Sequence, residues 1–218
     1  VSAVFIWTYI KRLYAARDSA ARKEQLGHVA GGYKTVIERV QQLIEAGGGA
    51  IHTGVTVARL APDPQAGIVV ETDRGRAHFD KVVFTGPVNV LQRVTDPALV
   101  DLARRGAEVE YLGVVCLVLI TRRPLVPYYI VNIADERIPF TGIIGMSNVV
   151  ATEETAGLNV TYLPKYVHSD DPLLRAPDEA LREQFLAGLR LMLPELDQCG
   201  IVGAHINRAL KVQPIQVL

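Results

Sequence analysis

The sequence predicts an α+β fold, with an antiparallel or mixed β-sheet flanked by helices and a separate β-meander. Two observations support this class. Apolar residues recur at helical spacing in segments 5–17, 34–46 and 178–193, and several segments between them have the apolar alternation or short apolar runs of strands. The elements follow one another as helix, meander, helices, sheet and helix. This order favours α+β over the regular βαβ alternation of a parallel sheet.

Each predicted helix has one apolar face and a recognisable end. Segment 34–46 ends at the glycines 47–49, which can close a helix and let the backbone turn into a strand. Segment 178–193 is followed by Pro194, which cannot continue a helix. Its apolar stripe is Leu181, Phe185, Leu189 and Met192. Two further short helices are predicted at 88–93 and 97–105.

The predicted strands form two groups. The meander comprises segments 50–52, 55–60, 68–72, 77–79 and 81–85, which are separated by proline and glycine turns. The second group comprises segments 111–121, 126–133, 140–148, 159–164 and 201–212. Segment 111–121 is apolar at odd and even positions alike, which predicts a central strand covered on both sides.

Composition excludes several classes of protein. Lys and Arg together number 23, as do Asp and Glu, so no net charge attracts nucleic acid or an anionic membrane. No apolar run reaches the roughly 18–20 residues of a membrane helix. Cys116 and Cys199 lack metal or redox spacing, which indicates buried thiols in a reducing cytoplasm, and we expect a cytoplasmic protein. The five histidines are dispersed, so no metal site is predicted.

Phosphate-binding loops are missing from the sequence. Neither G-x-G-x-x-G nor G-x-x-x-x-G-K-[ST] occurs, and the glycines 47–49 come after a helix instead of before one. The chain therefore lacks the local means to build a dinucleotide pyrophosphate site by itself.

An ordered set of segments nevertheless resembles the flavin-containing amine oxidases, protoporphyrinogen oxidases and phytoene desaturase-like enzymes. The set begins with the Leu-Gly-His-Val-Ala-Gly-Gly-Tyr stretch at 26–33 and a helix, and continues with the glycine turn at 48–51 and Val-Ala-Arg-Leu at 57–60. Residues 80–87 are similar to the family's A-D-x-V-I-x-T-x-P segment, with Phe79 where alanine is usual. The resemblance is clearest over residues 24–93.

The resemblance implies an FAD-dependent oxidoreductase. It implies that the backbone of Val57 lies beside the adenine end of FAD, with Thr85, Gly86 and Pro87 as the next cofactor contacts. Residues 34–93 would belong with the FAD-binding domain, and residues 1–33 and 94–218 would form the substrate (cap) domain.

The expected chemistry is hydride transfer from a substrate C–N or C–C bond to the flavin, with a small molecule as the partner. Four residues on the predicted sheet are candidates for lining the substrate pocket: Tyr128, Tyr129, Phe140 and Asn148. No catalytic acid or base is assigned, and a homo-oligomer is compatible with the sequence.

The chain lacks the family's N-terminal glycine-rich fingerprint and the C-terminal stretch that seals the flavin. We therefore expect the middle section of a longer enzyme, which by itself binds FAD weakly or not at all and is inactive. Two alternatives remain open. One is a non-catalytic binding or oligomerisation module, and the other is a flavoprotein of nucleotide-sugar or polysaccharide metabolism.

Overall fold

A computed structural model describes residues 3–15, 27–99 and 109–215. The chain divides into two compact units: unit 1 is residues 1–36 with 110–218, and unit 2 is residues 37–109. The sequence-based division placed its boundaries after residues 33 and 93, and the roles given to the two parts stay predictions. Helices together with antiparallel sheets confirm the α+β class.

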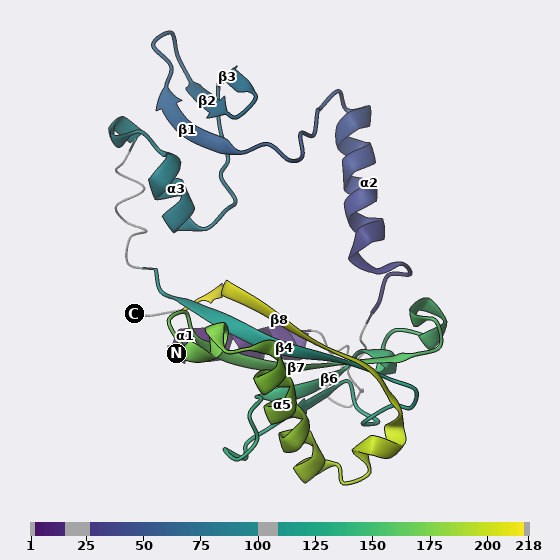
Figure 1. Cartoon of the computed structure of the whole chain (residues 1–218). Helices are drawn as coiled ribbons and strands as arrows, with labels where there is room; N and C mark the ends of the chain where they lie inside the picture. The colour runs from purple at the N-terminus through teal and green to yellow at the C-terminus, as the bar shows by residue number, and fades with distance from the viewer. Residues whose placement is uncertain (1–2, 16–26, 100–108, 216–218) are drawn as a thin grey trace. The chain divides into compact units, whose positions relative to one another are not determined.

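Unit 1 is built on a five-stranded antiparallel sheet with strand order β5-β6-β7-β4-β8 (Figure 1). Its strands are β4 (Tyr111–Thr121), β5 (Ile130–Asn132), β6 (Gly142–Gly145), β7 (Asn159–His168) and β8 (Ile201–Pro214). The long strand β4 pairs with β7 on one side and β8 on the other, so that Leu117 lies opposite Leu163 and Ile206. The prediction of a strand at 111–121 is confirmed to the residue.

The core of unit 1 lies between this sheet and helix α5 (Asp178–Met192). From Gly113 to Thr121 the odd-numbered residues of β4, such as Leu117, are buried, whereas Tyr111 and the even-numbered residues are half-buried. The expectation of a central strand covered on both sides therefore holds fully for the odd-numbered face and in part for the even-numbered face. Helix α5 contributes Leu181, Phe185 and Leu189 to the core, in the predicted spacing. The Phe185 ring lies 5.7 Å from that of Phe140, centroid to centroid.

Strands β5 and β6 are shorter than the predicted segments 126–133 and 140–148. The physical reason is a set of tertiary hydrogen bonds. Residues Met146–Asn148 form the 3₁₀ helix η2, and the side-chain amide of Asn148 donates to the carbonyls of Val126 and Tyr128. These bonds hold the chain in a turn beside the sheet. The other 3₁₀ helices of unit 1 are η3 (Thr152–Thr155), η4 (Pro172–Arg175) and η5 (Leu196–Cys199).

Unit 2 contains a three-stranded antiparallel meander of strand order β1-β2-β3. Its strands are β1 (Val57–Pro62), β2 (Ile68–Thr72) and β3 (Gly75–Phe79), followed by α3 (Val88–Val94) and η1 (Pro97–Leu99). The strands predicted at 50–52 and 81–85 are not formed, because among the described residues these segments have no strand to pair with. Of the helix predicted at 97–105, residues 100–105 lie outside the described residues.

Helices α1 (Ala3–Ala15) and α2 (Gly32–Ala46) match the predicted segments 5–17 and 34–46, apart from residues 16–17, which are not described. The predicted apolar stripe of α2 is present but exposed, since this helix has no buried residue. Within residues 3–15, 27–99 and 109–215, no helix has both the length and the apolar character needed to cross a bilayer.

Candidate functional site

A hollow of about 320 Å³ in unit 1 is the candidate site, and we call it the Tyr129 pocket. One wall is the loop before α2 together with the first turn of that helix, and the other is the segment around β5 and η2. The lining residues are Gly27, His28, Val29, Gly32, Tyr33, Val36, Tyr129, Met146 and Val149. The pocket thus combines aliphatic and aromatic side chains with one histidine.

The first wall depends on the Gly31-Gly32 pair. Both glycines have left-handed backbone conformations, with φ of 78° and 70°, and the Gly32 amide donates to the Val29 carbonyl at 2.7 Å. A Cβ at Gly31 would lie 2.5 Å from Thr35 Oγ1, which itself donates to the Ala30 carbonyl at 3.0 Å. The two glycines therefore allow the tight turn from which α2 starts.

A carboxylate from η3 holds this loop. Glu154 Oε2 accepts a hydrogen bond from the Gly31 amide at 2.8 Å and lies 3.3 Å from His28 Nε2. The Gly31 amide and, secondarily, the hydrogen bond with His28 lower the pKa of Glu154 below its ordinary value. Both interactions favour the ionised carboxylate, so Glu154 is an anion at neutral pH.

Hydrogen bonds to neighbouring backbone groups hold the second wall in place. The Gly145 amide donates to the Tyr129 carbonyl at 2.8 Å, and the Val149 amide donates to the Met146 carbonyl at 2.9 Å. Ser147 Oγ accepts from an amide of β7, that of Val160, at 3.0 Å. This wall is therefore attached to strands of the sheet just before η2, at Gly145, and within η2, at Ser147.

The four predicted substrate residues lie in different environments. Tyr129 lines the pocket, whereas Asn148 supports the wall behind it through hydrogen bonds to backbone carbonyls. Tyr128 is 64% exposed and is not among the lining residues, and Phe140 is 1% exposed within the core. The structure does not bring the four together, and their contact with a substrate stays a prediction.

Several residues at this site were missed by sequence reasoning. His28 and Tyr33 stand in the quoted glycine stretch but were used only to identify it, and Glu154 is 123 residues from Gly31. The Gly-Gly pair was the one local signal, because such a pair marks a close backbone turn. Nothing in the sequence around Glu154 identifies its distant partner.

The predicted cofactor residues lie in unit 2. Val57 begins β1, an edge strand of the meander, and is 39% exposed. Thr85, Gly86 and Pro87 are exposed and precede α3. A Cβ at Gly86 would lie 2.7 Å from the ring of Phe84, so the absent side chain makes room for that ring. These features fit contact with the edge of an adenine and provide no phosphate site.

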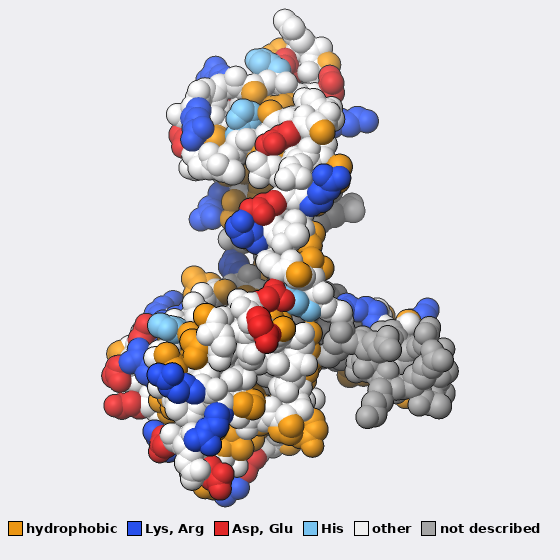
Figure 2. All heavy atoms as spheres, turned by 90° about the vertical axis from the view of Figure 1, so that its right-hand side faces the viewer, with side chains coloured by type: hydrophobic (Ala, Val, Ile, Leu, Met, Phe, Trp, Pro, Cys, Tyr) orange, Lys and Arg blue, Asp and Glu red, His pale blue; other side chains and the backbone are white. Residues whose placement is uncertain are grey.

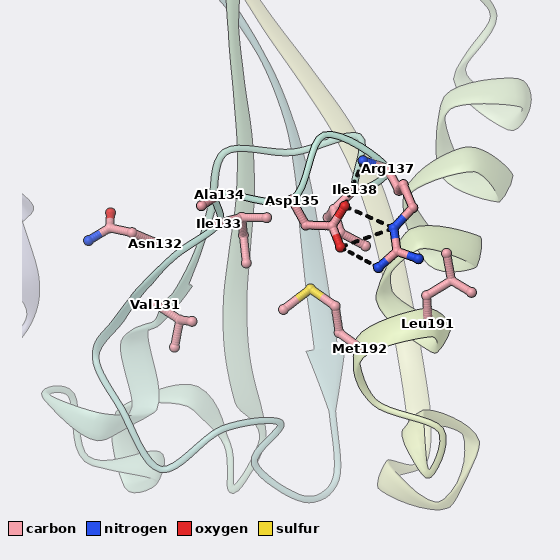
Figure 3. A pocket seen from close by; sticks show the side chains of 9 residues that line it. All are labelled: Val131, Asn132, Ile133, Ala134, Asp135, Arg137, Ile138, Leu191 and Met192. Atoms are coloured by element: carbon pink, nitrogen blue, oxygen red, sulfur yellow. Dashed lines mark hydrogen bonds and ion pairs between the residues drawn. The ribbon is translucent and has the colours of Figure 1, made fainter.

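A second hollow, of about 370 Å³, lies between the end of β5 and the end of α5 (Figure 3). Figure 3 shows Asp135 and Arg137 facing one another beside Met192, while Asn132 points away from them. Arg137 Nε lies 3.0 Å from one carboxylate oxygen of Asp135, and Arg137 Nη2 lies 2.6 Å from the other. This pairing lowers the pKa of Asp135 to about 2. The two charges neutralise each other, which leaves no net charge there for an ionic ligand.

Charged side chains of both signs are mixed on one face of the molecule (Figure 2). Figure 2 shows basic and acidic side chains interspersed on the face that it presents, as expected for equal numbers of each. Across the described ranges, no three His, Cys, Asp or Glu side chains are placed to hold a metal ion.

Comparison with known proteins identifies a family model and several solved structures that resemble this chain. The model described as flavin containing amine oxidoreductase matches residues 3–206. A crystal structure of a putative protoporphyrinogen oxidase from Exiguobacterium sp. 255-15 has a TM-score of 0.67 and 15% identity, over 85% of this chain and 40% of its own. No curated protein sequence matches.

Two further structures show the same fold. Reduced UDP-galactopyranose mutase has a TM-score of 0.68 and 15% identity, over 84% of this chain and 40% of its own. A double mutant of putrescine oxidase with redesigned cofactor binding has a TM-score of 0.63 and 17% identity, over 81% of this chain and 38% of its own. The chain therefore spans about two fifths of the length of these structures.

Proposed function

The chain belongs to the flavin containing amine oxidoreductase family, and we propose that it is the substrate-side part of an FAD-dependent oxidoreductase. The whole enzyme would oxidise a C–N or C–C bond of a small molecule: a hydride passes from the carbon to the flavin, and a proton leaves the adjacent nitrogen or carbon. The observation that carries this proposal is the family match over residues 3–206, a range that includes every residue of the Tyr129 pocket.

The lining of the pocket favours an apolar or amine substrate. Val29, Val36 and Met146 supply an apolar surface, and Tyr33 and Tyr129 supply rings whose faces attract an organic cation. Tyr33 is 86% exposed, so its ring is free of core packing and available to a ligand. Burial of apolar substrate surface here would contribute about 25 cal/mol per Å².

The same lining argues against a nucleotide sugar. None of the described residues that line the pocket is Lys or Arg, the side chains that best recognise a pyrophosphate. The similarity to UDP-galactopyranose mutase makes this substrate class the second one to assay. At 15% identity, however, that similarity supports only a shared fold.

FAD would contact this chain at a limited surface. The edge of β1 at Val57 would contact the adenine end through backbone groups, and the turn at Thr85, Gly86 and Pro87 would lie nearby. When bound, the flavin supplies the hydride acceptor. The residues of the Tyr129 pocket would bind the substrate, orient its reacting bond and exclude water. Because the sequence has no phosphate loop, we propose that the 218-residue chain alone holds FAD weakly or not at all.

The test uses the full-length protein that contains this chain. Under anaerobic conditions, a panel of primary and secondary amines and UDP-galactopyranose are each mixed with the protein, and bleaching of the flavin absorbance is followed. We expect bleaching by at least one amine and none by the nucleotide sugar. A shift of the flavin absorbance by UDP-galactopyranose without bleaching by any amine would move the substrate to the second class, because a mutase reaction leaves the redox state of the flavin unchanged overall. A flavin-free protein would favour a non-catalytic binding module.

Two neighbouring tyrosines provide the matched comparison for this assay. Tyr129→Ala removes a lining ring, whereas Tyr128→Ala removes a ring that is 64% exposed and outside the lining. We expect the substrate concentration for half-maximal bleaching to rise at least about tenfold for Tyr129→Ala, since burial of one large apolar side chain is worth about 1.5–3 kcal/mol and each 1.4 kcal/mol is a factor of about ten. A larger effect of Tyr128→Ala would place the substrate elsewhere.

A further inference from the structure

Glu154 connects the two walls of the Tyr129 pocket. Its Oε2 binds the Gly31 amide at 2.8 Å and lies 3.3 Å from His28 Nε2, and both residues belong to the loop that forms the first wall. Glu154 itself lies in η3, five residues beyond Val149 of the second wall. One carboxylate oxygen thus joins segments that are more than 120 residues apart in sequence.

The segment that presents Glu154 is firmly held. The Glu154 amide donates to the Ala151 carbonyl at 3.0 Å, and the Gly157 amide donates to the Thr152 carbonyl at 2.8 Å. The hydroxyl of Thr155 donates to the carbonyls of Thr152 and Leu158. The chain then enters β7 at Asn159. The segment that carries the Glu154 carboxylate is therefore held in place by its own hydrogen bonds and by its connection to the sheet.

The loop that it holds is less well supported by packing. Val29 and Tyr33 are 50% and 86% exposed, so their positions depend mainly on the backbone from which they project. That backbone runs through Gly31 and Gly32, both in left-handed conformations. Because glycine has many accessible backbone conformations, these two residues can adopt others once the hydrogen bond to Glu154 is lost. The Gly31 amide lies at the start of α2, where amides lack partners within the helix.

From this geometry we propose that Glu154 is a positioning residue that sets the separation of the two walls of the pocket. It does so by binding the Gly31 amide, and it also orients His28 through Nε2, so that Nδ1 is not engaged by Glu154. The importance of this position for substrate binding rests on the proposed function. The role of the Glu154 carboxylate in holding the loop at residues 27–33 does not rest on the proposed function, and it can be measured separately.

The test compares three variants in the full-length protein. Glu154→Ala removes the acceptor, Glu154→Gln keeps an acceptor oxygen without the charge, and Glu153→Ala is the matched control. Glu153 is the preceding residue of η3; it is exposed, and its side chain makes no hydrogen bond or ion pair with the described residues. Amide hydrogen exchange is measured for residues 27–33 and for β4 and β7, and KM and kcat are measured with any substrate that bleaches the flavin.

For Glu154→Ala we expect exchange at residues 27–33 to accelerate about threefold to tenfold, with β4 and β7 unchanged, because one hydrogen bond to a charged, partly exposed group is lost. KM should rise by a similar factor while kcat holds, as loss of uniform binding requires. Glu154→Gln should restore both the exchange at residues 27–33 and KM most of the way to their wild-type values. Glu153→Ala should show neither.

Two results would overturn the proposal. One is unchanged exchange at residues 27–33 in Glu154→Ala. The other is faster exchange throughout β4 and β7 with a lower kcat and the original KM, which would mean that the carboxylate only stabilises the fold. If no substrate bleaches the flavin, the proposed function fails, whereas the exchange result still decides the role of Glu154.

Discussion

Replacing Phe140 by alanine separates a core role from a role in substrate binding. The family resemblance and its place on the sheet made Phe140 a candidate pocket residue, whereas the structure places its side chain in the core at 1% exposure. Its ring packs at 5.7 Å and 41° against that of Phe185, which is fully buried on α5. Phe140→Ala would therefore leave a cavity between the sheet and the helix.

The expected cost follows from these contacts. Truncating a fully buried phenylalanine removes its transfer free energy and leaves a cavity, for a total of about 3–5 kcal/mol. Tyr128→Ala should cost within about 0.5 kcal/mol, since that side chain is mostly exposed. The free energy of opening is read from native-state hydrogen exchange of the most protected amides of β4, which report the unit that contains Phe140.

The two assignments of Phe140, to the core or to the substrate pocket, predict opposite effects on KM. If Phe140 is a core residue, the folded fraction of Phe140→Ala keeps the wild-type KM while its β4 amides exchange faster. A loss of less than about 1 kcal/mol together with a clear rise in KM would refute the core assignment. Phe140 would then contact substrate.

The remaining predictions concern packing and ionisation. Gly188→Ala should lower the free energy of unfolding by about 1–3 kcal/mol, measured by urea titration, because the new Cβ would collide with the ring of Pro139. Asp135 should titrate at about 2, against an ordinary value of 3.8, and Arg137→Ala should return its carboxyl ¹³C midpoint towards that value. Since the folded-state pKa of Asp135 is lowered, the stabilisation from this pair is complete above about pH 4 and is lost as the pH falls through 2. A titration midpoint of Asp135 near 4 in the wild-type protein would contradict this pairing. Burial raises the pKa of the Cys116 thiol, so thiol reagents at neutral pH should modify it more slowly in the native than in the unfolded protein.

Local patterns predicted the elements that carry their own signal. The apolar run 111–121 and the stripe of Leu181, Phe185 and Leu189 gave β4 and α5 nearly to the residue, because burial on a strand or helix face fixes the spacing of apolar side chains. The family, too, was predicted from an ordered set of short segments and is shown by the family model.

Features that depend on distant partners were not predictable in this way. Segment 81–85 has strand-like residues but forms no strand in the described structure, since a strand exists only where another backbone pairs with it. Strand β6 ends at Gly145 because Asn148 binds carbonyls some 20 residues earlier. The contact between Glu154 and Gly31 joins residues 123 apart, and neither neighbourhood indicates the other.

The most direct test of the proposed function is the flavin content of the full-length protein that contains this chain. Its absorption spectrum after purification is compared with the protein concentration from the same sample. The account predicts a flavin spectrum at stoichiometric content. A purified, folded, full-length protein without flavin that also takes none up from added FAD would contradict the assignment of this chain to an FAD-dependent oxidoreductase.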